Sequence, residues 1–128
     1  MGVAEAIRLA EALLPGVPAD EGKDDRWQGI IAVGEFVASE PEAVWGFIRR
    51  WGGHPQEDVR AAVAACLLEH LLEHHFGAFF PRVEELAVAD RLFGDTFCRC
   101  WPFGQAQEPG NAERFLALRE RLRSGCPA

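Results

Sequence analysis

Apolar residues recur every three or four positions along most of the chain, the spacing that places them on one face of an α-helix. Runs of β-branched residues, which favour strands, are absent from the sequence. Among the helix breakers, Pro41 and Gly52 are expected to bound the third helix, Gly77 to end the fourth and Pro81 to start the fifth. The pattern predicts an all-α protein, with helices over residues 3–14, 24–38, 41–51, 55–75, 81–89 and 111–123 and a less regular, aromatic-rich segment over about 93–110.

The predicted helix over residues 55–75 has the strongest apolar character. Its middle, residues 61–68, is apolar on every side, and such a helix is usually buried between neighbouring elements. Its polar stripe is narrow, because Asp58, Glu69 and Glu73 lie within about 60° of one another at 100° per residue. We therefore expect this helix at the centre of a packed layer.

Two pairs of predicted helices align with each other. The helices over 24–38 and 55–75 align at an offset of 34 residues, which matches Asp24 with Asp58, Arg26 with Arg60 and Glu35 with Glu69. The helices that follow them align through Pro41 and Pro81. Repeats of this length are typical of stacked helical pairs.

The run Asp58-Val59-Arg60-Ala61-Ala62 resembles the start of the second helix of a HEAT repeat, and the resemblance covers about residues 24–90. It implies that Asp58 caps its helix and that Arg60 pairs with an acidic residue of the adjacent repeat, such as Asp24 or Asp25. It also implies a short α–α superhelix of about five to six helices, with antiparallel hairpins stacked in a right-handed layer. A fold of this kind does not by itself specify a function.

Composition narrows the class of protein further. A chain of 128 residues is expected to form one domain spanning residues 1–128. The net charge of −7 argues against nucleic acid as a partner, because such binding depends on Lys and Arg. We find no membrane-spanning run and no signal peptide in the sequence. Four cysteines without a CxxC pair fit a reducing cytoplasm.

The segment Glu69-His70-Leu71-Leu72-Glu73-His74 is a candidate metal site. His70 and His74 are four residues apart and share a helix face, a spacing at which two imidazoles can bind zinc. Cys98 and Cys100 are possible further ligands, although Cys-x-Cys is tight for one tetrahedral ion. The alternative, which we favour, is that His70 is a hydrogen-bonded histidine of the core or of a groove and that the protein has no cofactor.

Two surfaces are candidates for binding a partner. In a HEAT-like layer the second helices line the concave side, which would display Glu35, Glu69, Glu73, His70 and His74 as an acidic surface suited to a basic protein. The aromatic segment is the other candidate: it either closes the end of the core or, through Arg91, Arg99 and Trp101, anchors a partner.

The sequence therefore favours a small cytoplasmic protein-binding module, such as an adaptor, a regulator or an immunity-like partner, and not an enzyme. A metal-binding or metal-dependent protein centred on His70 and His74 is the alternative. Binding of DNA lesions is a more remote one, because it requires a basic groove. The sequence makes no prediction of the oligomeric state.

Overall fold

In the computed structural model, which describes residues 1–14 and 25–125, every regular element of this part of the chain is helical. No helix in the described ranges is long and apolar enough to cross a membrane. The elements are α1 (Val3–Leu13), α2 (Asp25–Gly34), α3 (Pro41–Trp51), α4 (Glu57–Val63), the π-helical turn η1 (Ala64–Leu68), α5 (Glu69–Ala89), α6 (Arg91–Cys98), the 3-10 turn η2 (Gly104–Gln107) and α7 (Asn111–Gly125).

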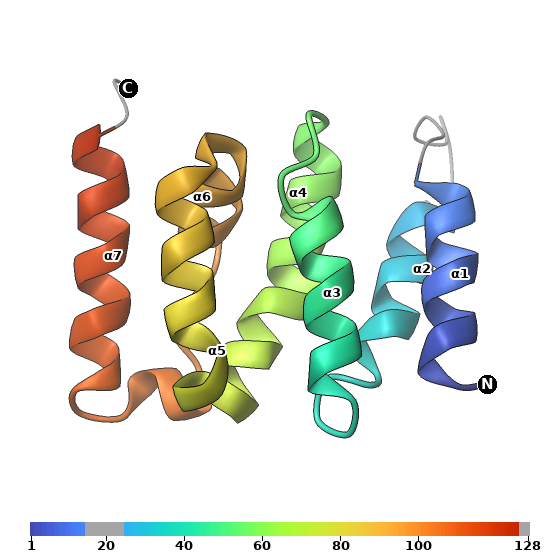
Figure 1. Ribbon diagram of the computed structural model, residues 1–128, viewed down its shortest axis with the longest axis horizontal. Coiled ribbons are helices and arrows are strands. Elements are labelled where there is room, and N and C mark those ends of the chain that lie inside the picture. The colour runs from blue at the N-terminus through green and yellow to red at the C-terminus, as the bar shows by residue number, and fades with distance from the viewer. Residues whose placement is uncertain (15–24, 126–128) are drawn as a thin grey trace.

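The helices are arranged side by side along the long axis of the molecule, from α1 at one end to α7 at the other (Figure 1). In this view α2 lies behind α1 and α4 lies behind α3, so the helices form two rows. In the second row α2 packs against α4 and η1, and α4 packs against α6. The all-α prediction is confirmed for the described residues.

The core lies between the two rows, and the continuous stretch of α4 and η1 runs through its centre. Ala62, Val63, Leu67 and Leu68 are fully buried, as the all-round apolar pattern predicted, whereas Ala65 faces solvent. The π-helical turn lies where α2 approaches most closely. A Cβ added to Gly34 would lie 2.7 Å from the carbonyl oxygen of Cys66, so this crossing requires a glycine.

The fourth helix breaks at His75, where its predicted end lies, but the residues expected to cause the break do not cause it. The helical path continues through η1 into α5 and is interrupted at His75, whose φ and ψ are −140° and 43°. Gly77 and Pro81, the expected breakers, both lie inside the helical segment that follows. The expectation that Gly77 ends one helix and Pro81 starts the next is therefore wrong.

A segment distant in sequence accounts for the position of this break. The backbone N–H of Phe76 donates to Oε1 of Gln105 at 2.9 Å, and Nε2 of Gln105 donates to the carbonyl of His74 at 2.7 Å. The side-chain amide thus pairs with backbone groups on both sides of His75. Beside it, Gly104 has a φ of 52° and packs against Glu73, where a Cβ would lie 2.6 Å from Cγ. Tertiary contacts, and not the local breakers, set the turn.

Other boundaries agree with the sequence more closely. Helix α3 begins at Pro41 and ends before Gly52, as predicted. Helix α2 ends at Gly34 and residues 35–39 form a turn, so it is shorter than expected. The acidic segment before it, including Asp24, lies outside the described residues. Helix α6 replaces part of the segment expected to be irregular.

The buried aromatic residues connect the last three helices. Phe76 and Phe80 stack at 4.6 Å between ring centroids, and Phe97 contacts Phe80 at 6.2 Å and Phe115 of α7 at 4.8 Å. All four rings are fully buried. Most of the aromatic cluster therefore fills the core at the α7 end of the molecule, which is one of the two predicted roles.

Arginine–aspartate pairs link successive helices of the second row. Arg26 of α2 is buried and donates to the carboxylate of Asp58 in α4. Arg60 of α4 is also buried and donates through Nε to Asp95 of α6 at 3.0 Å. Each arginine thus pairs with the following helix of the row.

This pairing corrects two expectations for the repeat. Asp58 is not the N-cap residue of its helix: it is the second residue of α4, where one carboxylate oxygen accepts the N–H of Val59 at 3.0 Å and the other faces Arg26. Arg60 pairs with Asp95 and not with Asp25. The physical reason is that the Arg60 side chain extends towards α6, and it is also held by the carbonyls of His54 and Pro55 in the segment between α3 and α4.

Candidate functional site

The structure does not keep the five residues of the predicted acidic surface together in one environment. Glu69 is buried, with 9% of its surface exposed, and its Oε2 accepts the backbone N–H of Trp101 at 2.8 Å. Glu35 is exposed in the turn after α2. Because Glu69 is engaged inside the protein, it does not offer its charge to a basic partner, and that part of the prediction is wrong.

His70 and His74 both lie next to Glu73. Nδ1 of His70 is 2.9 Å from Oε1 of Glu73, and Nε2 of His74 is 3.7 Å from the same oxygen. His70 is hydrogen-bonded, as expected, but it is exposed, so its expected placement in the core is wrong. In the described part of the chain, no three His, Cys, Asp or Glu side chains are grouped as metal ligands. Cys100, a possible further ligand, is buried, and burial raises its pKa well above the ordinary value.

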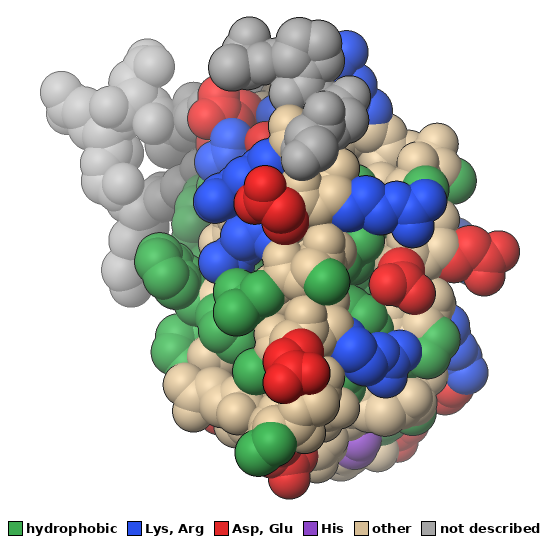
Figure 2. All heavy atoms as spheres, turned by 90° about the vertical axis from the view of Figure 1, so that its left-hand side faces the viewer, with side chains coloured by type: hydrophobic (Ala, Val, Ile, Leu, Met, Phe, Trp, Pro, Cys, Tyr) green, Lys and Arg blue, Asp and Glu red, His purple; other side chains and the backbone are tan. Residues whose placement is uncertain are grey.

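A pocket of about 470 Å³ opens between the second row and the last helix. We call it the Trp101 pocket. It is lined by side chains that come from α2, α4, η1, α6, the segment after α6, and α7, namely Trp27, Ala61, Ala65, Cys98, Arg99, Trp101, Arg119 and Arg123. Figure 2 shows the α7 end of the molecule, where Lys and Arg side chains gather beside hydrophobic ones in the upper left of the view.

Trp101 is the most exposed aromatic residue of the described chain, with 65% of its surface accessible. The peptide group between Cys100 and Trp101 is nevertheless fixed by two hydrogen bonds. The N–H of Trp101 donates to the buried carboxylate of Glu69, and the carbonyl of Cys100 accepts from Nη2 of Arg119. The guanidinium of Arg119 also lies 5.6 Å from the Trp101 ring centroid. The backbone that carries the indole is thus held in place, while most of the ring surface stays open.

Burial affects the acid that holds this backbone. Desolvation raises the pKa of Glu69 above its ordinary value of 4.5, although the hydrogen bond from Trp101 opposes the shift. A carboxyl in this environment binds a proton more tightly than the same carboxyl in water. The carboxyl that holds Trp101 therefore takes up a proton at a higher pH than a carboxyl in water does.

The three arginines of the pocket differ in how they are already engaged. Arg99 donates to Asp95 at 2.9 Å and to Glu57 at 2.8 Å, and these bonds raise its pKa. Arg119 uses one nitrogen for the Cys100 carbonyl, and its Nε is buried without a hydrogen bond. Arg123 is exposed, and the described residues offer its side chain no ion pair.

Asp95 is shared between this pocket and the row of arginine–aspartate pairs. It accepts from both Arg60 and Arg99 through the same oxygen. Burial acts to raise the pKa of Asp95, but the hydrogen bonds from the two arginines outweigh it and lower the pKa below the ordinary value. Asp95 therefore stays ionised and fixes Arg99 at the edge of the pocket.

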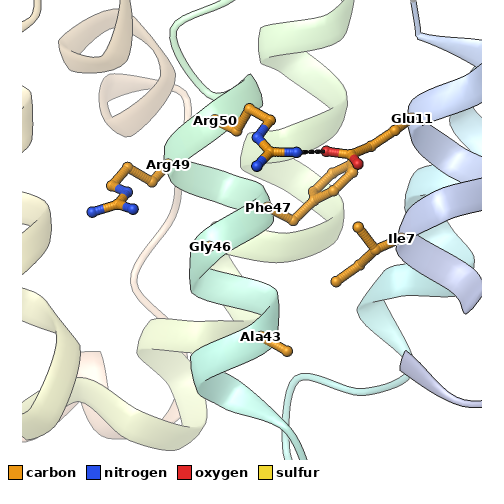
Figure 3. Close-up of a pocket in the computed structure, with 7 residues that line it drawn as sticks. All are labelled: Ile7, Glu11, Ala43, Gly46, Phe47, Arg49 and Arg50. Atoms are coloured by element: carbon orange, nitrogen blue, oxygen red, sulfur yellow. Dashed lines mark hydrogen bonds and ion pairs between the residues drawn. The ribbon is translucent and has the colours of Figure 1, made fainter. Parts of the chain in front are cut away.

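A second pocket, of about 450 Å³, lies between α1 and α3 (Figure 3). Ile7 and Phe47 face each other across it, and Arg49 points away to the other side of α3. Two of its charged groups are already paired, because Arg50 donates to Glu11 at 2.7 Å, and the Trp51 indole donates to the same oxygen at 2.9 Å. Fewer hydrogen-bond donors are therefore open to a ligand in this pocket than in the Trp101 pocket.

The sequence identified part of the Trp101 pocket. It predicted Arg99 and Trp101 as partner-binding residues, and both line the pocket. It missed Trp27, Arg119 and Arg123. The two α7 residues are four positions apart on a helix that the sequence did predict, so their shared face was a usable signal.

Comparison with known proteins adds no identification. No family model, no curated protein and no solved structure matches this chain. Its function is therefore inferred from its own residues.

Proposed function

We propose that this protein is a binding module for another protein, built from stacked HEAT-like hairpins, and that the Trp101 pocket is its binding site. In this proposal the protein works in the cytoplasm, as an adaptor, regulator or immunity-like partner, and not as an enzyme. The observation that carries it is the exposed Trp101 indole, which lies beside arginines on a backbone that Glu69 and Arg119 hold by hydrogen bonds to the Trp101 N–H and the Cys100 carbonyl. Tryptophan and arginine are the residue types that dominate binding hot spots.

The rigidity of the Trp101 backbone supports this assignment. A side chain that is ordered before binding loses less conformational entropy when a partner arrives. Exposure of a large aromatic surface also has a cost in water, about 25 cal/mol per Å² of apolar area. An indole both exposed and fixed in place fits a site that is covered by a partner.

The recurring arginine–aspartate pairs support the HEAT-like part of the proposal. Arg26 with Asp58 and Arg60 with Asp95 repeat the same link from one helix of the second row to the next. Stacked hairpins of this family are expected to present the second row as their binding side, which is the row that contributes Trp27, Ala61 and Cys98 to the pocket. The right-handed curvature of the layer stays a prediction.

The proposal is tested by the Trp101→Ala variant. Phe103→Ala is the matched control, because Phe103 is also exposed, at 41%, but does not line the pocket. Each purified protein is used as bait in an extract of the cells that naturally express it. The bound proteins are quantified by mass spectrometry. We expect a partner that wild type and Phe103→Ala recover equally and that Trp101→Ala loses about tenfold or more. Equal recovery by all three would contradict the proposal.

A further inference from the structure

The charge of the Trp101 pocket is opposite to the charge of the whole chain. The protein has a net charge of −7, yet the eight residues that line the pocket include three arginines and no acidic residue. Interfaces generally bring surfaces of complementary potential together. The pocket is thus a local positive site on an acidic protein.

We infer that the Trp101 pocket binds an acidic peptide segment of its partner, with a carboxylate held between Arg119 and Arg123 and a neighbouring apolar side chain against the indoles. This inference rests on the proposed protein-binding function. It reverses the charge of the partner expected from the sequence, which predicted an acidic surface and a basic partner.

The spacing of the α7 arginines suits a single carboxylate. Residues four apart on a helix have Cβ atoms about 5–6 Å from each other, so Arg119 and Arg123 can approach one acid from neighbouring turns. Guanidinium groups bind carboxylates with two parallel hydrogen bonds. Arg99 contributes less, because Asp95 and Glu57 already accept its hydrogen bonds.

The remaining lining residues specify what lies next to the carboxylate. Trp27 and Trp101 offer aromatic surface, and Ala61 and Ala65 form a small apolar floor. An acidic residue flanked by a leucine or an aromatic residue fits both parts of the pocket.

A peptide fits these features better than a nucleic acid does. A phosphate chain is held by many cationic contacts along its length, whereas here one of the three arginines is already bonded to two acids and the rest of the molecule is acidic. A short acidic segment needs only the local site. Single-stranded DNA is therefore included as a competing probe.

The test uses a random dodecapeptide phage library selected on wild-type protein and on Arg123→Glu. The matched control is Arg121→Glu, which makes the same charge change at an exposed position of the same helix outside the pocket. Thermal unfolding of each variant checks that the fold is retained. Enriched peptides are synthesised and their dissociation constants measured, together with that of a labelled oligothymidine.

We expect peptides rich in Asp and Glu that bind wild type and Arg121→Glu alike and bind Arg123→Glu about tenfold more weakly. Enriched peptides that are basic or neutral, or that bind Arg121→Glu and Arg123→Glu equally, would overturn the inference. If such basic, neutral or Arg123-independent peptides still require Trp101 for binding, the proposed function stands and only the inference of an acidic partner fails. If no peptide is enriched on wild type, or if oligothymidine alone binds in an Arg123-dependent way, both fail.

Discussion

Glu69 shows how a single residue controls the candidate site without belonging to its surface. The carboxylate is buried beneath the segment that follows α6 and accepts the N–H of Trp101. Its charge is not compensated by an arginine, and burial raises its pKa. A raised pKa means that the folded protein binds this proton more tightly than the unfolded chain does.

The consequence for stability has a definite sign. The contribution of Glu69 to the free energy of unfolding is fully present below its pKa in the unfolded chain and is lost as the pH rises through the raised pKa of the folded state. We expect Glu69→Gln, which keeps an oxygen acceptor for Trp101, to be at least as stable as wild type at pH 7. Its stability advantage over wild type should shrink as the pH falls through the raised pKa of Glu69 in the folded protein, and it should be gone below the ordinary value of 4.5.

Urea unfolding of the two proteins across this pH range measures the difference. If the free energy of unfolding of Glu69→Gln is lower than that of wild type by more than about 1 kcal/mol at neutral pH, the charge of the carboxylate, and not its hydrogen bond, holds the segment around Trp101.

At the scale of elements, the break at His75 is the feature that most depends on distant contacts. It separates the part of α5 that continues the central helix from the part that turns back, and it is bridged by the side chain of Gln105. Since η2 also follows the Trp101 segment, this contact connects the turn in α5 with the position of the pocket.

We expect Gln105→Ala to lower the free energy of unfolding by about 1–2 kcal/mol, because the N–H of Phe76 and the carbonyl of His74 lose their partner. Gln107→Ala is the matched control, since Gln107 is exposed in the same turn. Chemical denaturation gives the stability, and amide hydrogen exchange at Phe76 should accelerate in the first variant alone. Identical denaturation curves for the two variants would show that the turn in α5 does not depend on Gln105.

These elements also show which parts of the structure are encoded locally. Pro41 and the apolar stretch over 61–68 specified a helix start and a buried centre, because proline geometry and all-round burial act within a few residues. The break at His75 has no local signal, since the groups that fix it come from η2. Helix α6 has a local signal at its start, because Asp90 accepts the N–H groups of Leu92 and Phe93 as a helix cap.

The candidate site was predictable to a similar degree. Trp101 and Arg99 could be singled out because aromatic and arginine residues cluster in that part of the sequence. The spacing of Glu69 puts it on the polar stripe of the central helix and so predicts an exposed side chain, and no local pattern indicates that the backbone of Trp101 covers it. Arg119 and Arg123 line the pocket because α7 packs against α6.

At the scale of the whole molecule, the central claim is that the face formed by the second row and α7 receives the partner. The four tryptophans lie in different parts of the structure. Trp27 and Trp101 line the pocket, Trp45 is in the core, and Trp51 lies next to Glu11 at the α1–α3 side. Each indole N–H gives its own signal in a nitrogen–proton NMR spectrum, so one titration reports on all of these places.

The measurement that tests this claim most directly is such a titration with the tightest acidic peptide from the library selection. The account predicts that the indole signals of Trp27 and Trp101 shift progressively and saturate together, while those of Trp45 and Trp51 stay in place. A shift of the Trp51 signal with no change at Trp27 and Trp101 would place the partner on the opposite side of the molecule and contradict the account.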